Sequence, residues 1–529
     1  MSGRRWRMMM SMAAVVVGLG LAMAGAQEPK RGGILLWYDY ADPARLDMHT
    51  ESGLAVSQAI AGLYSGIVQW GPEDGMQVGP DLAERWELSE DKQTYTFHLR
   101  KGVKWHDGEP FTSADALYSL KRILDPEKRS PRCGSLLRPL VDSVEAPDDF
   151  TINVRLKFQT PIFLSALASA WCKVLPKHII ERDGDMTRVE SQIGTGPFKL
   201  KKYVRGSIIE WERNSDYFIK GWPLLDGVKQ YIINARPTQV AAIKSGRIDL
   251  FGFPVKRPQI EEILKARKDI NYSEVPLGVI HQLHMNTKKE PFNHPDIRRA
   301  VHLAIDRHVI IEKAMDGLGI PCAILDPDLF GDYALPMEEV LQMPGCRRDK
   351  TEDLAEAKRL VAKHYPDGVD IVLSVRSLPT YLDHAPLVMP QLKKIGIRAK
   401  MKTWESAAGF AAWARGDFTV IGSQATAMTF MDPSAPFTLI FTTESPRNYG
   451  RLPLPQLDEL YEKSLRELDE QKRIAIFHEY QRRILRGDTP AVTYGWSRTA
   501  MFVAKKIKDW TRGPTVYDNT SFTNVWLDQ

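Results

Sequence analysis

A change of hydrophobic period marks the stretch from Val275 to Gly317. Its first part is extended, and a polar turn over residues 286–290 follows. Beyond Pro295, apolar residues recur at helical spacing: Ile297, Ala300, Val301, Ala304 and Ile305. This spacing puts them on one face of a helix, and Pro295 suits its first turn because its missing N–H would be unpaired there. The pattern predicts a strand, a turn and a helix that stops at Gly317.

The stretch from Asp81 to Leu124 has a period of two, then a helical period. Apolar Tyr95, Phe97 and Leu99 alternate with polar residues, as a half-buried strand requires. Two turns follow, and Thr112 or Ser113 then caps a predicted helix. His106 and Asp107 lie in the second turn, where a structural role is favoured over an active site.

In the second half of the chain, predicted strands alternate with predicted helices. The strands cover residues 371–376, 398–403 and 418–422, with helical patterns at 349–361 and 387–395. This order predicts a mostly parallel, helix-covered sheet, and ligands of such sheets bind beyond the carboxyl ends of the strands. Arg376, Trp404 and the run from Gly422 to Asp432 lie at such ends.

Length and charge narrow the class of protein. A chain of 529 residues exceeds one typical core, so two or three subdomains are expected, and 43% hydrophobic and 26% charged residues are ordinary for a globular protein. The formal net charge is +5, but three arginines belong to the first seven residues. The remaining excess is too small to predict a nucleic-acid partner.

The N-terminus has the pattern of an export signal. Arg4, Arg5 and Arg7 precede an apolar stretch that ends near Ala24, and Ala24-Gly25-Ala26 has the small residues of a cleavage site. We predict a signal peptide over residues 1–26 and a periplasmic mature protein that is not embedded in the membrane, since the apolar stretch falls short of the roughly 20 residues that span a bilayer. Arg4-Arg5 also allows a twin-arginine signal, although Arg7 favours the ordinary secretory route.

Four cysteines suit an oxidising compartment. Three pairings are possible, and the simplest joins sequence neighbours, Cys133 with Cys172 and Cys322 with Cys346. Four free thiols are the alternative. No CxxC spacing occurs, so a zinc or thioredoxin-like site has little support.

Two of these stretches resemble one known family. DLAERWELSEDKQTYTFHLRKGVKWHDGEPFTSADALYSLKRIL (81–124) and HMNTKKEPFNHPDIRRAVHLAIDR (284–307) are similar to the family 5 extracellular solute-binding proteins of ABC importers, which bind dipeptides, oligopeptides or nickel chelates. The resemblance spans nearly all of the mature chain. It implies an α/β, two-lobed periplasmic-binding-protein (Venus flytrap) fold with an extra small α/β subdomain inserted in the first lobe.

The same resemblance implies the domain boundaries. Lobe I takes residues 27–75, 194–278 and 490–529, the small subdomain takes 76–193, and lobe II takes 279–489. A solute would bind between the lobes, which would close by hinge bending near Leu277–His281 and Arg486–Ala491. The expected partners are the solute and a membrane permease with cytoplasmic ATPases, and we expect a monomer that is no enzyme and needs no cofactor.

Ligand contacts are also implied residue by residue. Arg376 matches the arginine with which dipeptide binders hold the ligand's carboxylate, a task that suits the planar fork of a guanidinium; a structural salt bridge is the alternative. The other expected contacts are Tyr38, Asp39, Tyr40, Trp404, Gly422, Gln424, Thr429, Asp432, Arg447 and Tyr449. For Tyr38, Asp39 and Tyr40 the alternative is packing at the edge of the first sheet.

One departure from the family pattern affects the expected ligand. Dipeptide binders place an aspartate where this chain has Thr429, and a threonine cannot neutralise an ammonium group. Ordinary peptides are therefore less expected, although Asp432 or Glu405 could take that role. We expect a peptide-like, opine-like or other carboxylate-bearing solute, and a second arginine, Arg447, would fit an anionic or polyhydroxylated one.

Two alternatives stay open. A nickel chelate or other metallophore is possible within the family, although His281 and His284 would point to opposite faces of a strand and His302 and His308 would diverge on a helix. An exported hydrolase with a non-local active site is the alternative of another class. No GxSxG, HExxH or CxxC motif supports it, and the Gly-rich run 194–198 lacks the ending of a phosphate-binding loop.

Overall fold

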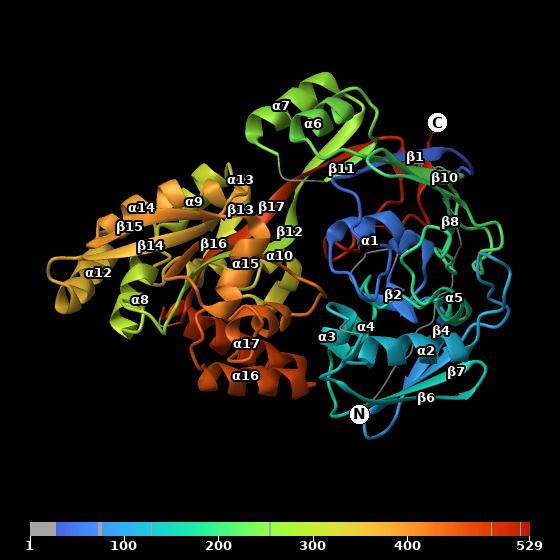
Figure 1. The fold of residues 1–529 in the computed structure, drawn as a ribbon, viewed down its shortest axis with the longest axis horizontal. Helices are drawn as coiled ribbons and strands as arrows, with labels where there is room; N and C mark the ends of the chain where they lie inside the picture. The colour runs from blue at the N-terminus through green and yellow to red at the C-terminus, as the bar shows by residue number, and fades with distance from the viewer. Residues whose placement is uncertain are drawn as a thin grey trace, which may run out of the picture.

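The computed structural model describes residues 28–71, 77–128, 130–252, 255–487, 489–518 and 520–528. The predicted signal peptide lies outside these residues. Figure 1 shows two lobes joined by two long strands, with the mixed α/β composition and the two-lobed arrangement expected from the sequence. Among the described residues, no helix combines the length and apolar character that crossing a bilayer takes.

Lobe I contains a four-stranded sheet in the order β1 (Ile34–Asp39), β10 (Gly227–Ile232), β9 (Ile208–Arg213) and β8 (Phe198–Val204). β1 is parallel to β10, and the other pairs are antiparallel. Helix α1 (Leu54–Ile60) packs here, and the indole of Trp211 donates to the carbonyl of Ala59 over 3.0 Å. Gly62 allows this packing, because a Cβ there would lie 2.5 Å from the Trp211 ring. Helices α6 (Arg236–Lys244) and α7 (Arg257–Ala266) follow.

A second sheet belongs to the small subdomain. Its strands lie in the order β4 (Ala83–Leu88), β5 (Thr94–Leu99), β7 (Thr151–Leu156) and β6 (Val141–Asp148), all antiparallel. Tyr95, Phe97 and Leu99 are buried, as their alternation predicts. Helix α2 (Ser113–Leu124) begins with a capping box between Thr112 and Asp115. Cys133 and Cys172 form a disulfide between α3 (Cys133–Leu137) and the loop after α4 (Phe163–Leu167).

His106 has a structural role. One ring nitrogen accepts from the amide of Gly194 over 3.1 Å, and the other lies 3.1 Å from the carbonyl of Gly196. Burial lowers the pKa of His106 to about 4. The ring therefore ties the turn of the small subdomain to the Gly-rich run of lobe I, in agreement with the structural interpretation of this turn.

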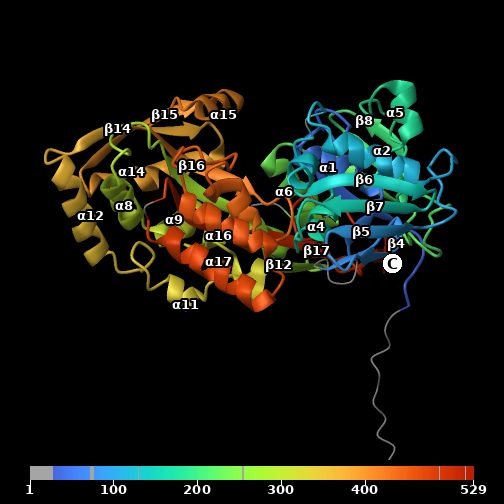
Figure 2. The same ribbon diagram turned by 90° about the horizontal axis from the view of Figure 1, so that it is seen from below.

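Two long antiparallel strands, β12 (Ile270–Met285) and β17 (Ala491–Ala504), connect the lobes (Figures 1 and 2). They belong to a seven-stranded sheet in the order β11 (Leu250–Gly252), β17, β12, β16 (Val420–Ala427), β14 (Val369–Arg376), β15 (Ile397–Trp404), with β13 (Gly319–Pro321) paired to β17. Only β14 is parallel to its neighbours, β15 and β16. The prediction of a mostly parallel sheet is therefore wrong, because both connecting strands enter the sheet and run in opposite directions.

The ladder between the two long strands is interrupted near the middle. Its register shifts between Pro276 and Ile280, and Gly278 has φ +73°, a conformation that favours glycine. The residues paired with this interruption are Trp496 and Arg498. The second hinge expected near Arg486–Ala491 stays a prediction; in the structure Ala491 pairs with His284.

The helix predicted from Pro295 to Gly317 is two helices. Helix α8 (Pro295–Ala304) buries Ile297, Ala300 and Val301, as predicted, but it ends at Ala304. Helix α9 (Arg307–Ala314) begins anew because Asp306 caps it, accepting from the amide of Val309 over 3.1 Å. Together with α12 (Thr351–His364) and α14 (Ala385–Lys393), they pack around the core of the lobe II sheet.

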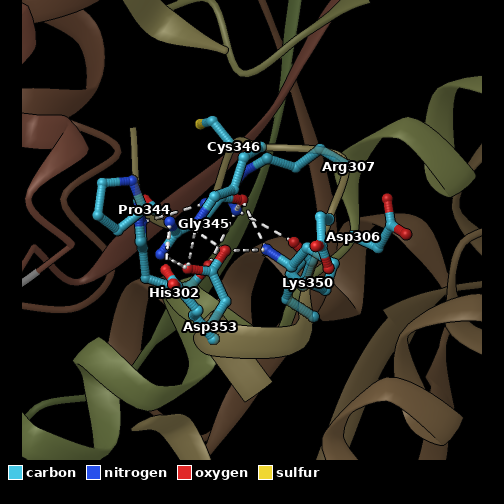
Figure 3. A network of polar contacts seen from close by, with 12 residues as sticks. His302, Asp306, Arg307, Pro344, Gly345, Cys346, Lys350 and Asp353 are labelled. Atoms are coloured by element: carbon cyan, nitrogen blue, oxygen red, sulfur yellow. Dashed lines mark hydrogen bonds and ion pairs between the residues drawn. The ribbon is translucent and has the colours of Figure 1, made fainter. Parts of the chain in front are cut away.

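Arg307 organises a buried polar network beside these helices (Figure 3). Its guanidinium donates to the carbonyl of His302 over 2.9 Å and to the carbonyl of Thr493 over 2.9 Å, and it also bonds the carbonyl of Gly345. Asp353 anchors the same loop by accepting from the amide of Gly345 over 2.8 Å. A disulfide from Cys322 to Cys346 ends the loop, so both cysteine pairs are those that the sequence favours.

The last part of lobe II is helical and lies on the side of the small subdomain (Figure 1). Helix α15 (Ser406–Arg415) precedes β16, and α16 (Pro455–Arg466) and α17 (Glu470–Leu485) follow later in the chain as a pair of amphipathic helices. The remaining elements are short: η1 (Ala61–Leu63), β2 (Val68–Trp70), β3 (Val78–Pro80), α5 (Lys177–Asp183), α10 (Pro327–Phe330), η2 (Gly331–Tyr333), α11 (Met337–Val340), α13 (Pro379–Leu382), η3 (Phe437–Phe441), β18 (Ile507–Lys508) and β19 (Trp526–Leu527).

Candidate functional site

The candidate site begins at the carboxyl ends of β14 and β15. These strands are parallel, and their last residues, Arg376 and Trp404, lie opposite one another. Helix α15 follows β15 directly and approaches both. A Cβ at Gly409 would lie 3.2 Å from side-chain atoms of Arg376 and Trp404, so a glycine here lets the helix lie close.

Arg376 lies between aromatic rings. Its guanidinium carbon is 4.3 Å from the ring centre of Tyr381 and 4.1 Å from that of Phe410, with Trp413 at 5.7 Å. Such contacts stabilise a cation on the face of each ring. The rings pack around the guanidinium, and a side-chain hydrogen bond with Tyr381 also stabilises its charge.

The N–H groups of Arg376 pair with no acidic side chain within the described part of the chain. One terminal nitrogen donates to the hydroxyl of Ser406 over 2.9 Å, and Nε has no hydrogen-bond partner although Arg376 is only 5% exposed. Burial is the largest of the effects that lower the pKa of this guanidinium, and the positive charge of Arg447 adds to it. Among the described residues Arg376 forms no salt bridge, the alternative considered for it, and a buried cation without a carboxylate is costly.

A second cation lies close by. Arg447 donates to the carbonyl of Ala425 over 2.9 Å and contacts the hydroxyl of Thr426 at 3.2 Å, both on β16. Tyr449, two residues on, is half-buried, and burial raises its pKa. Two guanidinium groups near one tyrosine, neither paired with an acid of the described ranges, make a positive site that an anionic group of a solute would neutralise.

His284 completes this cluster from β12. Its ring meets the ring of Tyr449 edge-on at 5.3 Å, and neither ring nitrogen has a hydrogen-bond partner among the described residues. Burial, together with the charge of Arg447, lowers the pKa of His284 to about 3. The histidine is therefore neutral at physiological pH and adds no charge to the two arginines.

Two predicted contacts on β16 lie inside the sheet. A Cβ at Gly422 would lie 2.9 Å from the side chain of Leu373, and the carbonyl of Gly422 accepts from the hydroxyl of Tyr494 over 2.5 Å. Gln424 is fully buried, and its amide donates to the carbonyl of Ala425 over 2.7 Å, whereas its Oε1 has no partner. Gly422 thus has a packing role, and Gln424 retains an unused acceptor.

Thr429 and Asp432 are placed differently from each other. The carbonyl of Thr429 accepts from the hydroxyl of Ser169 over 3.1 Å, so Thr429 lies where lobe II meets the other half of the molecule. Asp432 pairs with Arg473 of α17 at 2.7 and 3.0 Å, and both side chains are buried. The carboxylate of Glu405 accepts from the amide of Ala408 over 3.0 Å at the start of α15. Both acids considered as substitutes for the missing aspartate are therefore already engaged.

Two of the predicted contacts of lobe I, Tyr38 and Asp39, end β1, and the third, Tyr40, follows it. Tyr38 is buried and stacks on Phe251 at 4.9 Å, and burial raises its pKa. Asp39 is fully buried. Its Oδ1 accepts from the amide of Tyr40 over 2.7 Å, its Oδ2 has no partner, and burial raises its pKa well above the usual range. Tyr40 is half-buried, and burial raises its pKa to about 12. Of the three, Tyr40 has the most accessible side chain.

Sequence reasoning missed the rings around Arg376. Tyr381, Phe410 and Trp413 were not among the expected contacts, and neither was Ser406. The signal available in the sequence was the pair Phe410 and Trp413, three residues apart in a segment that follows Trp404. A helix there places both rings on one face, but the sequence does not say which strand end that face covers.

A serine–histidine pair bears on the hydrolase alternative. The hydroxyl of Ser497 lies 2.7 Å from Nε2 of His281. Nδ1 of His281 has no hydrogen-bond partner among the described residues, the ring stacks on His384 at 5.5 Å, and burial lowers its pKa to about 3. A histidine that activates a nucleophile needs an orienting group and a pKa near neutrality, and His281 has neither.

The histidines considered as metal ligands have other partners. His302 lies 3.1 Å from the carbonyl of Pro344, and His308 lies 2.9 Å from that of Cys346. His281 and His284 contact different rings, as their spacing predicts. The described residues contain no group of three or more histidine, cysteine, aspartate or glutamate side chains that could hold a metal ion.

Known proteins are similar over most of the chain. The probable deoxycholate-binding periplasmic protein YgiS of Escherichia coli K12 is 27% identical over 467 residues, which are 84% of this chain and 85% of that protein. The periplasmic oligopeptide-binding protein OppA of Salmonella typhimurium is 26% identical over 91% of this chain and 90% of its own length. These relatives are binding proteins rather than enzymes.

Solved structures agree with the fold. The binding protein AgaA from A. tumefaciens R10, solved with agropinic acid, covers 94% of this chain and 99% of its own, at 26% identity and a TM-score of 0.76. DppA from Helicobacter pylori, solved with the peptide STSA, has a TM-score of 0.77 at 24% identity and also covers 94% and 99% of the two chains. The profile of the family described as "Bacterial extracellular solute-binding proteins, family 5 Middle" matches residues 77–447. The chain belongs to the family 5 bacterial extracellular solute-binding proteins.

Proposed function

We propose that this protein is the periplasmic substrate-binding component of an ABC importer and that it captures a small carboxylate-bearing solute between its lobes. The observation that carries the proposal is the buried guanidinium of Arg376, which has aromatic rings around it and no acid within the described residues to pair with. A carboxylate offers two oxygens in the plane of the guanidinium, which is the geometry that its N–H groups can meet.

The second arginine narrows the class of solute. Arg447 adds a positive charge near Arg376, while Asp432 and Glu405 are engaged elsewhere and Thr429 carries no charge. An ordinary peptide has an N-terminal ammonium group, and none of these residues offers a free carboxylate to neutralise it. The proposed solute is therefore an opine-like or modified peptide-like compound, whose second polar end is neutral or anionic.

The proposed cycle follows from the architecture. The two lobes would swing about the interrupted ladder near Gly278, whose partners are Trp496 and Arg498. A solute that contacts both lobes favours the shut state because it binds that state more tightly. The shut protein would then dock as a monomer on a permease whose ATPases are separate polypeptides. No cofactor enters this cycle, and no step alters the solute.

Calorimetry can test the role of Arg376. Agropinic acid, the peptide STSA and deoxycholate are suitable probes, since the similar proteins above are named for or solved with them, and native mass spectrometry would identify a solute that stays bound through purification. With the probe that binds, Arg376→Ala is expected to weaken affinity more than tenfold because it removes a charge-assisted contact.

Arg415→Ala is the matched control, because Arg415 is 63% exposed in its side chain and pairs with Asp417 on the surface. It should bind as the unaltered protein does. Equal affinities for Arg376→Ala and the unaltered protein would reject the assigned role of Arg376. Conversion of a probe into a product would reject the binding function.

A further inference from the structure

Lobe II touches the small subdomain through an apolar contact that includes neither Arg376 nor Arg447. On the small subdomain, the contact consists of Leu140 before β6 and Ile162 before α4, with Phe158 after β7 packed against them. On lobe II, Leu465 lies at the end of α16, with Tyr461 one turn earlier. Leu140, Ile162 and Leu465 are only 2%, 5% and 5% exposed, so the contact removes these three aliphatic side chains from water.

A cation–aromatic contact borders this patch. The guanidinium carbon of Arg466 lies 4.2 Å from the ring centre of Phe158. Figures 1 and 2 both show α16 beside the helical part of the small subdomain. All of these groups belong to the chain itself, so the contact does not depend on a solute.

Hydrogen bonds connect the lobe II side of this contact to Asp432, one of the predicted ligand contacts. Arg473 of α17 donates from Nε to the carbonyl of Ser464 over 3.0 Å, and its other end pairs with Asp432. Ser464 precedes Leu465, and Asp432 lies three residues after Thr429, whose carbonyl bonds Ser169. One buried arginine thus connects the end of α16 to the segment where the lobes also meet by a hydrogen bond.

We propose that the contact of Leu140, Phe158 and Ile162 with Tyr461, Leu465 and Arg466 is a latch that holds the two lobes together and sets how often the clamp is shut. Two lobes that share buried apolar surface are held together by it, since exposing that surface to water is unfavourable. The small subdomain then has a function beyond that of a scaffold, because it supplies one half of the latch.

The latch has a consequence for affinity. A solute that binds the shut state sees an apparent dissociation constant equal to the intrinsic one divided by the fraction of molecules that are shut. Opening the latch therefore weakens binding without altering any residue of the candidate site. This inference rests on the proposed two-lobed clamp, but its test needs no solute, so it can fail while the binding function stands.

Small-angle X-ray scattering of the full mature protein tests the latch. Leu465→Asp places a charge in the apolar patch and is expected to increase the radius of gyration, because the lobes move apart. Leu468→Asp is the matched control. It makes the same substitution three residues away, at a leucine that is 39% exposed, and the radius of gyration is expected to stay that of the unaltered protein.

A second variant approaches the latch from the other lobe. Phe158→Arg puts a positive charge opposite Arg466 and removes the ring, at a half-buried position where folding should persist. It should increase the radius of gyration as Leu465→Asp does, with an unchanged far-ultraviolet circular dichroism spectrum. If Leu465→Asp unfolds the protein, the radius of gyration of the Phe158→Arg protein tests the latch instead. A folded Phe158→Arg protein with the original radius of gyration would overturn the latch.

Discussion

At the scale of single residues, the site depends on how one guanidinium is held. Arg376 could be predicted from the sequence because it ends a strand, and strand ends carry ligands in such sheets. Its surroundings could not, because Tyr381, Phe410 and Trp413 come from two helices whose faces are fixed only by packing. These rings and the hydroxyl of Ser406 hold the guanidinium at the carboxyl end of β14.

This arrangement predicts that charge alone is not sufficient at position 376. Arg376→Lys keeps the positive charge but loses the planar fork that lies between Tyr381 and Phe410. We expect about a tenfold loss of affinity for the solute, which corresponds to about 1.4 kcal/mol. Calorimetry with the probe that binds measures it. Unchanged affinity would mean that the site recognises charge without geometry.

The ion pair of Asp432 gives a second prediction at this scale. Asp432 and Arg473 are buried with side-chain exposures of 8% and 6%, so Asp432→Asn leaves a buried charge without its partner. Such losses cost about 3–5 kcal/mol of unfolding free energy, measured by urea denaturation. Affinity for the solute should change little, because the carboxylate faces α17.

The control for this prediction is Asp417→Asn, which breaks the pair of Arg415 and Asp417, whose side chains are 63% and 55% exposed. Exposed pairs contribute about 0–1 kcal/mol. If Asp432→Asn lowered affinity and left stability unchanged, Asp432 would be the ligand contact that the sequence suggested.

At the scale of helices and strands, the sequence predicts an element correctly where the pattern lies within one short segment. The alternation of Tyr95, Phe97 and Leu99 and the apolar stripe of α8 predict what the structure contains. The prediction of mostly parallel strands in the lobe II sheet was wrong, because the direction of a strand depends on which distant segments it pairs with. The antiparallel pairing of β12 and β17 along almost their full length cannot be read from the sequence. The break between α8 and α9 depends on one cap, Asp306.

The whole molecule contains several buried histidines whose protonation opposes folding. Burial lowers the pKa of His49 and His106 to about 4 and that of His281 and His284 to about 3, and it lowers that of His302 well below the ordinary value. In the unfolded chain their pKa values return to about 6.5. The unfolded state then binds more protons near that pH, so these five residues make the folded state less stable as the pH falls below about 6.5.

Buried acids act in the opposite direction, among them Asp39, whose pKa burial raises well above its ordinary range. Burial raises the pKa of Asp81, Asp326 and Asp518 to about 6. Their unfolded values lie near 3.9, so between about pH 4 and 6 the folded state binds the extra protons. Within that window, falling pH stabilises the protein through these acids, and they offset part of the effect of the histidines. Between about pH 6 and 7 the histidines dominate.

The free energy of unfolding should therefore rise steeply with pH between about pH 6 and 7. Each histidine that is neutral when folded and half-protonated when unfolded contributes about 0.7 kcal/mol per pH unit, so five give at most about 3.5 kcal/mol per pH unit near pH 6.5. Urea denaturation at several pH values measures this slope. His284→Gln should reduce it by about a fifth, since it removes one of five titrating groups, whereas Arg415→Ala, which removes no histidine, should leave it unaltered. If the free energy of unfolding of the unaltered protein did not change from pH 6 to 7, the prediction would be wrong. The buried imidazole rings would then already be protonated in the folded state.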